Sequence, residues 1–487
     1  MKRTFGLART WLIAFCAISA ISGCTRHDSP DSTISRTIEK PITKISMAVQ
    51  AFADTEEMER QIANFNTSHP DWLVELIKIP HDNYDITLNR LMTSGKGPDV
   101  FQLNTLWLNS YISKEWLLDL SDESFEGMTY PKWATEYTKQ KNGRYYAIPT
   151  GMNTLRLIYN KELLDGAGCD STRPPSTLSE MKDCAIKIST AGTGFRRYGF
   201  ALPGGDDETG FRRPLEIAGT LSGVYYYDFR KGKFDFSVYE PWFRTILEMK
   251  SKGGLFPGEI SLKNDTALSQ FAEGNIGMMY ATNSDIAQLF RMNPMNFSWG
   301  TTMPPLLDSS KADKGALMID IEPPFVINTF TVHKQEAFEL LRFLLSREFQ
   351  GALYEQGDVI PTLTTITGNP QYQTSPPNLE AFLPRSNESP YPKEPKFGLA
   401  DSGSSVASSI WGDEARMKTY REILQGAKQP DSALKEMTQK FNTSLDLAIY
   451  NQLIGENQYV FPNFDPKNPL KYANTPDEIR NGSVLIH

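Results

Sequence analysis

Apolar runs alternate with amphipathic helical patterns along the first part of the chain. Residues 45–52 and 72–79 have the apolar character of buried strands, and residues 99–103 form a third, shorter run. Between them, residues 56–66 and 84–94 place apolar side chains at helical spacing. Because strand and helix patterns alternate, we predict an α/β fold in which helices cover a parallel sheet.

Four further helices are predicted later in the chain. The clearest begins at Thr177, because Thr177-Leu178-Ser179-Glu180 fits a capping box ahead of an apolar helical face. The other three are predicted over residues 334–345, 417–424 and 432–447. Residues 370–397 are rich in Pro, Asn and Ser, which predicts a long irregular excursion on the surface.

The N-terminus has the features of a secretory signal. Three basic residues precede an apolar segment over residues 11–21, which is shorter than the ~20 residues of a membrane span. The segment ends in Ile21-Ser22-Gly23-Cys24, which resembles a bacterial lipobox, whose cysteine becomes the acylated first residue. The alternative is a buried N-terminal helix with an incidental cysteine. We expect residues 1–23 to be a signal peptide and Cys24 to anchor the protein to the outside of the bacterial cell membrane.

Composition limits the remaining possibilities. Residues 24–44 are polar, with too little apolar surface to offset the entropy of ordering them, so we expect a flexible tether. A chain of 487 residues exceeds one typical core, which favours two lobes. The 50 basic and 58 acidic residues give a net charge of −8 without Lys/Arg blocks, which argues against nucleic acid as a partner.

Motifs for catalysis or metal binding are scarce. The five histidines are scattered, and the sequence has no C-x-x-C, nucleophile elbow, phosphate-binding loop or dinucleotide fingerprint. We therefore expect no metal and no cofactor. Cys169 and Cys184 are available for one disulfide in an oxidising compartment, or else are two buried thiols. A glycosidase needs only two suitably spaced carboxylates, so a surface carbohydrate hydrolase stays open as an alternative.

Short motifs occur in a characteristic order between residues 45 and 447. They are Ile45-Ser46-Met47-Ala48-Val49, His69-Pro70-Asp71, Gly97-Pro98-Asp99-Val100-Phe101, Tyr145-Tyr146-Ala147-Ile148-Pro149, Leu157-Ile158-Tyr159-Asn160-Lys161, Phe271-Ala272-Glu273-Gly274, Gly357 with Ile360-Pro361, and Gly426 with Ala433-Leu434. In this order they resemble the extracellular solute-binding proteins of ABC importers, in the sugar-binding family 1 group that includes maltodextrin-binding protein.

This resemblance implies a fold and a mechanism. It implies two α/β lobes joined by crossing strands, the first at residues 147–150 and the second at residues 303–305. The implied lobe boundaries are 45–148 with 305–350, and 149–304 with 351–487. Ligand binding in the cleft would favour the closed arrangement. The implied protein is a monomeric, non-enzymatic receptor that passes a saccharide or other polar solute to an ABC permease. A chemosensory or adhesion role is the other alternative.

A saccharide cleft requires aromatic platforms beside carboxylates and amides. In this family the contacts come from loops at the carboxyl ends of strands. Asp54, Thr55 and Glu56 follow the first predicted strand, and Asn104 and Trp107 follow the third. The other candidate ligand-binding residues are Asn153 after the first crossing, Asp206 and Asp207 in a polar turn, Asn283, and Trp411 near where the family often places a stacking aromatic.

Several candidates have a structural alternative. Asp54 and Thr55 are also suited to cap the helix that begins at residue 56. Asp206 and Asp207 are also typical of a solvated turn, and Trp107 of core packing. Thr282-Asn283-Ser284 stands where some relatives carry a Gly-Pro-Trp turn, which weakens a maltodextrin assignment and makes Asn283 a hydrogen-bonding candidate.

Overall fold

A computed structural model describes most of the chain beyond the predicted tether. It covers residues 42–51, 56–80, 83–123, 128–138, 143–374, 379–395, 412–452, 454–455, 457 and 459–471. The predicted signal peptide, nearly all of the tether, Cys24 and the candidates Asp54, Thr55 and Trp411 lie outside the described residues.

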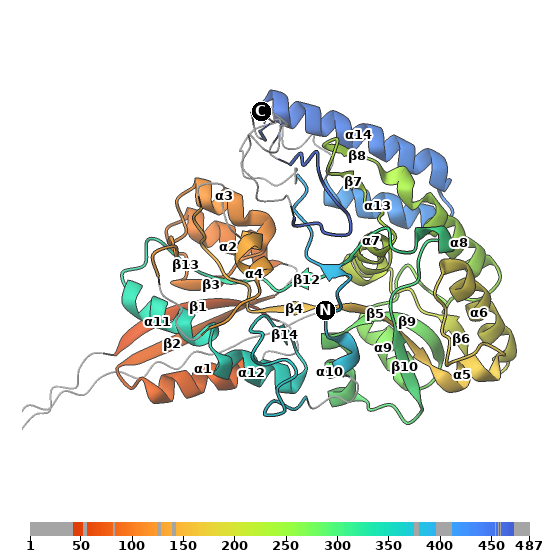
Figure 1. The fold of residues 1–487 in the computed structure, drawn as a ribbon, viewed down its shortest axis with the longest axis horizontal. Coiled ribbons are helices and arrows are strands. Elements are labelled where there is room, and N and C mark those ends of the chain that lie inside the picture. The colour runs from red at the N-terminus through yellow and green to blue at the C-terminus, as the bar shows by residue number, and fades with distance from the viewer. Residues whose placement is uncertain are drawn as a thin grey trace, which may run out of the picture. The chain divides into compact units, whose positions relative to one another are not determined.

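The first sheet has four strands in the order β13-β3-β1-β2 (Figure 1). The long strand β1 (Thr43–Ala51) is parallel to β2 (Trp72–Pro80) and to β3 (Val100–Gln102), whereas β13 (Phe325–Ile327) is antiparallel to β3. We call the part of the chain packed on this sheet the first lobe. The three predicted strands are confirmed.

Helices cover this sheet, and their apolar faces are buried together with apolar residues of its strands. Residues Ile62 and Phe65 of α1 (Glu56–Ser68) are buried in the same core cluster as apolar residues of β1 and β2, as the helical spacing predicts. The other helices of the first lobe are α2 (Tyr84–Thr93), α3 (Leu108–Ser113), α4 (Lys132–Thr138), α11 (Lys334–Leu344) and α12 (Arg347–Gln356). The predicted helices at 56–66, 84–94 and 334–345 are therefore confirmed.

The second sheet, in the order β10-β5-β9-β6, forms the basis of the second lobe. Strand β5 (Leu155–Asn160) is antiparallel to β9 (Ile276–Thr282) and to β10 (Trp299–Thr302), and β6 (Tyr198–Phe200) is parallel to β9. Every residue of β5 and β9 is buried, as expected for strands covered on both faces.

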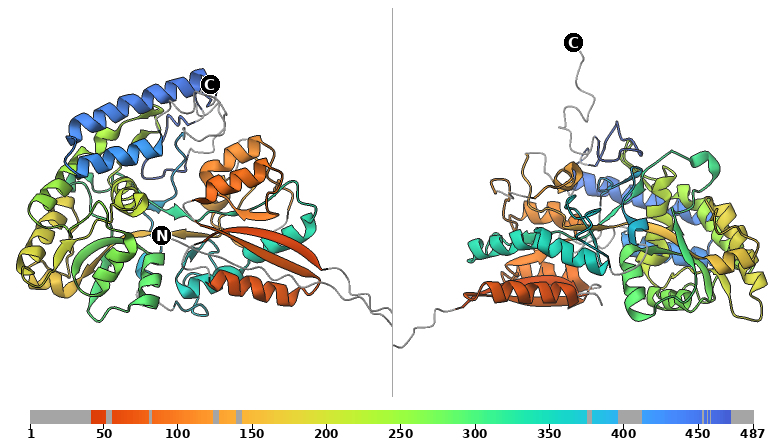
Figure 2. Two further views of the ribbon diagram at one scale, coloured as in Figure 1. Left: turned by 180° about the vertical axis from the view of Figure 1, so that it is seen from behind. Right: turned by 60° about the horizontal axis from the view of Figure 1, so that its bottom comes forward.

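Helices surround the second sheet, and the C-terminal pair packs with them (Figures 1 and 2). They are α5 (Lys161–Gly166), α6 (Leu178–Ala191), the π-helix η3 (Glu208–Ile217), α7 (Ala218–Leu221), α8 (Glu240–Ser251), α9 (Asn264–Ala272), α10 (Asn283–Met292), α13 (Asp413–Leu424) and α14 (Pro430–Tyr450). The predicted capping box of α6 forms between Thr177 and Glu180. Helix α14 begins earlier than predicted because proline is well suited to a first helical turn.

The remaining elements are short. They are the 3₁₀ turns η2 (Thr105–Trp107), η4 (Phe236–Tyr239), η5 (Ser309–Lys311) and η6 (Leu379–Phe382), and the two-residue strands β7 (Tyr227–Asp228), β8 (Lys233–Phe234), β11 (Leu317–Met318) and β15 (Glu388–Ser389). Between residues 370 and 395 the described segments are mostly irregular, as predicted, but Leu379 and Phe382 are buried in the second lobe.

The chain crosses between the lobes three times, and the three crossing segments pair as strands of one small sheet. Its central strand β4 (Gly151–Asn153) is antiparallel to β12 (Asp320–Ile321) and to β14 (Ile360–Pro361). Gly151 is required here, because a Cβ atom would lie 2.1 Å from the side chain of Val359. The first crossing strand, β4, begins at residue 151, directly after the crossing predicted at residues 147–150.

The second crossing between the lobes occurs later in the sequence than predicted. Met303, Leu306 and Leu307 pack against the core of the second lobe, and the amide of Leu306 donates to the carbonyl of Ser176. The predicted crossing at residues 303–305 is therefore wrong, and the chain crosses at β12. The return from the first lobe is at β14 instead of residue 351, because Leu353 and Val359 still pack in the first core.

The two cysteines that remain after the predicted lipidation site form a disulfide. Cys169 and Cys184 have Cα atoms 6.0 Å apart and connect the loop after α5 to the buried face of α6. Of the two alternatives that the sequence leaves open, the structure has the disulfide.

Candidate functional site

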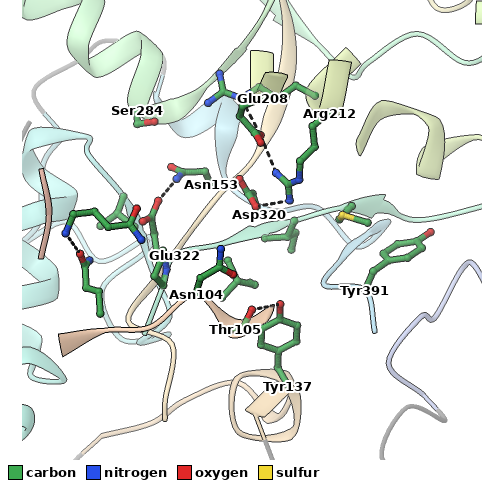
Figure 3. Close-up of a pocket in the computed structure, with 18 of the residues that line it drawn as sticks. Asn104, Thr105, Tyr137, Asn153, Glu208, Arg212, Ser284, Asp320, Glu322 and Tyr391 are labelled. Carbon is green, nitrogen blue, oxygen red and sulfur yellow. Dashed lines mark hydrogen bonds and ion pairs between the residues drawn. The ribbon is translucent and has the colours of Figure 1, made fainter. Parts of the chain in front are cut away.

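A cavity of about 600 Å³ is lined by residues of both lobes and of the small connecting sheet. The first lobe contributes Asn104, Thr105 and Tyr137, which follow β3 or lie on α4, and the second lobe contributes Glu208 and Arg212 from η3 (Figure 3). Asn153, Asp320 and Glu322 come from β4, from β12 and from the residue just after it. The volume lies within the range of small-molecule binding sites in proteins.

Amide side chains connect the second lobe to the carboxyl group of Glu322. The Nδ2 of Asn283, at the start of α10, donates to Oδ1 of Asn153 over 2.7 Å, and Asn153 donates in turn to Oε1 of Glu322. The backbone amide of Thr154 donates to Asn283 and fixes its orientation. Burial and the charge of Asp320 raise the pKa of Glu322 to about 7. Its carboxyl group is therefore able to donate or accept a hydrogen bond near neutral pH.

Two arginines of η3 are held by carboxylates in the cavity wall. Arg212 contacts Glu208 at 2.8 Å and Asp320 at 2.9 Å, so it links η3 to the connecting strand β12. Arg213 contacts Asp285 at 2.6 Å. Since these side chains already have partners, the wall presents hydrogen-bonding groups in fixed positions.

Another part of the cavity lining consists of tyrosine and charged side chains that contact one another. The hydroxyl groups of Tyr225 and Tyr226 donate to the carboxylate of Glu394 over 3.2 and 2.8 Å. The guanidinium of Arg416 lies 4.6 Å from the ring centre of Tyr226 and 3.3 Å from the carboxylate of Glu216. All five side chains line the cavity.

The aromatic ring of Tyr137 and the ammonium group of Lys393 meet across the cavity. The hydroxyl of Tyr137 lies 3.2 Å from that of Thr105, and Nζ of Lys393 lies 5.1 Å from the ring centre of Tyr137. Tyr137 belongs to the first lobe, whereas the neighbouring Tyr391 packs in the core of the second. Burial lowers the pKa of Lys393 to about 7, and the charge of Glu394 opposes this only in part.

Three of the predicted site residues gather at this cavity. Asn104 and Asn153 line it, and the fully buried Asn283 lies directly behind Asn153.

Other predicted residues lie elsewhere in the structure. Trp107 packs partly buried against the core of the first lobe, which agrees with its structural alternative. Asp206 pairs with Lys263 at 2.6 Å and accepts the amide of Asn264 at the start of α9, Asp207 pairs with Arg421, and Glu56 is exposed in the first turn of α1. None of these four candidates is among the residues that line the cavity.

Sequence reasoning missed Glu322, Lys393 and the acid–base pairs of η3. Asp320 and Glu322 flank a single isoleucine just before two prolines, which is a weak signal for polar groups on a short connecting strand. Lys393 lies in the predicted surface excursion, and no local pattern distinguishes it from a solvated lysine.

Neither a metal site nor a membrane-spanning helix is present among the described residues. Among them, no three His, Cys, Asp or Glu side chains are arranged to hold a metal ion. None of the helices within the described ranges combines the length and apolar character that a bilayer crossing requires.

Known proteins resemble this chain along most of its length. A putative binding protein of Brucella abortus is 22% identical over 419 residues, which cover 82% of this chain and 96% of that protein. The sn-glycerol-3-phosphate-binding periplasmic protein UgpB of Shigella dysenteriae is 22% identical over 284 residues, covering 54% of this chain and 61% of UgpB.

Solved structures show the same fold. The maltose-bound MalE3 of T. maritima superposes with a TM-score of 0.67 at 20% identity, covering 82% of this chain and 99% of MalE3. The GacH receptor of Streptomyces glaucescens gives 0.66 at 18% identity, with coverage of 83% and 99%. The predicted two-lobe binding-protein fold is thereby confirmed.

The family assignment rests on the match to a family model. Residues 60–380 match the model of the bacterial extracellular solute-binding proteins. Because this match covers more than half of the chain, the protein belongs to the bacterial extracellular solute-binding protein family.

Proposed function

We propose that this protein captures a saccharide or a closely related sugar derivative between its lobes and delivers it unchanged to the permease of an ABC importer. The observation that carries the proposal is the cavity to which both lobes contribute hydrogen-bonding side chains. A solute that touches both lobes stabilises their closed arrangement by its difference in affinity for the closed and open forms.

The chemistry of the cavity suits a molecule with many hydroxyl groups. Each sugar hydroxyl is both a donor and an acceptor, and the cavity offers the amides of Asn104 and Asn153 beside the carboxyl of Glu322. Partly apolar tyrosine rings, such as Tyr137 and Tyr225, are suited to pack against sugar ring faces. Because the arginines are already paired, binding requires little reordering of charged side chains.

The names of similar proteins support the same class of solute. The structural neighbours include proteins solved with maltose and with acarbose, and UgpB is described as binding sn-glycerol-3-phosphate. These ligands are polyhydroxylated, which is the property that the cavity is suited to recognise.

We further propose that the protein acts as a monomer held on the outside of the cell membrane by lipid on Cys24. The lipobox-like ending at Cys24 and the polar tether after it support this part of the proposal. Each buried methylene of an acyl chain contributes about 0.8 kcal/mol, so several chains on one cysteine give stable anchoring without other membrane contacts.

Binding of a saccharide panel to the purified protein tests the proposal. Isothermal titration calorimetry and thermal unfolding are expected to identify a solute that binds at 1:1 stoichiometry. At 100 times its Kd that solute should stabilise the fold by about 2.7 kcal/mol. Chromatography should recover the solute unchanged. A panel without any binder would contradict the proposal, and a cleaved product would favour the hydrolase alternative.

The sensing and adhesion alternatives need a separate measurement. Uptake of the radiolabelled solute is expected to fail in cells that lack either this protein or its permease. Normal uptake in cells without this protein would favour a sensing or adhesion role for the same cavity.

A further inference from the structure

Lys393 differs from the other cationic residues that line the cavity. Arg212, Arg213 and Arg416 each contact at least one carboxylate within 3.3 Å. For Lys393 no carboxylate ion pair is formed within the described residues, and its ammonium contact is the ring of Tyr137.

The carboxylate nearest to Lys393 in sequence is already engaged. Glu394 accepts hydrogen bonds from the hydroxyl groups of both Tyr225 and Tyr226. Burial disfavours the charged form of the Lys393 side chain, because the protein replaces its water shell only in part, and the charge of Glu394 offsets this only partly. The aromatic ring favours a nearby cation but does not neutralise its charge. A negatively charged ligand group would provide the missing partner.

The backbone that carries Lys393 is firmly held, which distinguishes this residue from a solvated surface lysine. Glu388, in β15, forms an ion pair of 2.8 Å with Arg156 of β5, and both side chains are fully buried. Arg156 also donates to the carbonyls of Ala381 and Leu383. The segment that leads to Lys393 is therefore fixed to the second lobe, and the ammonium group points to Tyr137 of the first lobe.

The charges in the cavity are unevenly placed. The negative charges of Asp320 and Asp358 act on Glu322, and the positive charge of Arg213 opposes them only in part, so that end of the cavity favours hydroxyl groups over an anion. Among the described residues, Glu394 is the charged group that acts on Lys393, and its negative charge favours the ammonium form. An acidic sugar would accordingly bind with its anionic group at Lys393 and its hydroxyl groups toward Glu322.

We propose that the solute is an acidic saccharide, carrying a carboxylate or phosphate, and that Lys393 is the residue that selects it. The inference rests on the proposed function and makes its substrate class more specific. An anion held at Lys393 also lies beside Tyr137, so it would contact both lobes and favour their closed arrangement.

The test compares matched neutral and acidic sugars by isothermal titration calorimetry. The probes are glucose against glucuronate and glucose 6-phosphate, and galactose against galacturonate and digalacturonate. We expect an acidic member to bind the wild-type protein at least tenfold more tightly than its neutral counterpart. Comparing the carboxylate sugars with the sugar phosphate shows which of the two anionic groups the protein prefers.

Three variants assign the preference to one residue. Lys393→Met is expected to weaken binding of the acidic sugar at least tenfold and to change neutral-sugar binding less than threefold, whereas Lys393→Arg keeps the preference. The control Lys96→Met, at an exposed lysine outside the cavity lining, should leave both affinities unchanged.

The experiment distinguishes failure of this inference from failure of the proposed function. Neutral sugars that bind the wild-type protein as tightly as acidic ones would overturn this inference and leave the proposed function intact. A preference that Lys393→Met retains would also overturn it. The absence of binding by any saccharide would overturn the proposed function and the inference together. The wild-type comparison does not depend on the folding of any variant.

Discussion

The carboxyl group of Glu322 should make the unliganded protein less stable at alkaline pH. Its side chain is partly buried, accepts a hydrogen bond from Asn153 and lies near the negative charges of Asp320 and Asp358. Burial is the largest cause of the rise of its pKa from 4.5 to about 7, and Asp320 adds to it. The folded state therefore binds the Glu322 proton more tightly than the unfolded state does.

The magnitude and the pH window follow from that difference. At 1.36 kcal/mol per pKa unit, the full effect is about 3 kcal/mol, and water in the cavity reduces it to about 1–2 kcal/mol. Below pH 4.5 both states are protonated and the folded state carries no penalty. The penalty grows as the pH rises from 4.5 through 7 and is constant above that.

Glu322→Gln removes the charge and keeps an oxygen to accept from Asn153. At pH 8 we expect the free energy of unfolding to rise by about 1–2 kcal/mol, and at pH 4.5 to change by less than about 0.5 kcal/mol. Urea unfolding at several pH values measures this difference. Glu123→Gln, at an exposed carboxylate outside the cavity lining, is the control. A variant that is no more stable than wild type at pH 8, or a gain independent of pH, would refute the reasoning.

Three other perturbations have defined outcomes. Arg156→Met leaves the fully buried Glu388 without a counter-ion and should cost about 3–5 kcal/mol in urea unfolding, and adding Glu388→Met should restore much of the loss. Reduction of the Cys169–Cys184 disulfide should cost about 3 kcal/mol for a separation of 15 residues, and equal stability in the presence of reductant would contradict this. Asn153→Ala should weaken solute binding about tenfold by calorimetry, because it removes a cavity amide and leaves Glu322 without its hydrogen-bond donor.

Local sequence patterns determine much of the fold of this protein. Strands β1, β2 and β3 and helix α1 were predictable because burial imposes apolar runs or helical spacing on their residues. The fourth strand of that sheet, β13, was not predicted. The start of α6 is predictable because a capping box involves only the residues Thr177 to Glu180.

The second crossing depended on distant contacts. Leu306 and Leu307 are apolar in sequence, but no local pattern indicates which of two cores they join. The candidate site likewise contains some residues that local patterns indicate and others that only distant contacts place. Asn104 follows β3 and was predictable as a loop residue, and Asn153 was predicted from its place after the first crossing, although it ends strand β4. Asp206 pairs with Lys263, which lies far away in sequence and which no local pattern indicates. Lys393 reaches the cavity through a segment that Arg156 holds at Glu388 and that Tyr391 holds at the carbonyl of Ala316, and no local pattern indicates these contacts.

The most direct test of solute capture between the lobes combines X-ray scattering and recovery of the solute. It uses the purified protein, with and without a saturating saccharide identified by calorimetry. We predict 1:1 binding, a smaller radius of gyration in the bound state, and return of an unchanged solute after denaturation of the protein. A radius of gyration unaffected by the bound solute, together with a chemically altered sugar, would contradict a receptor that closes on its ligand and releases it intact.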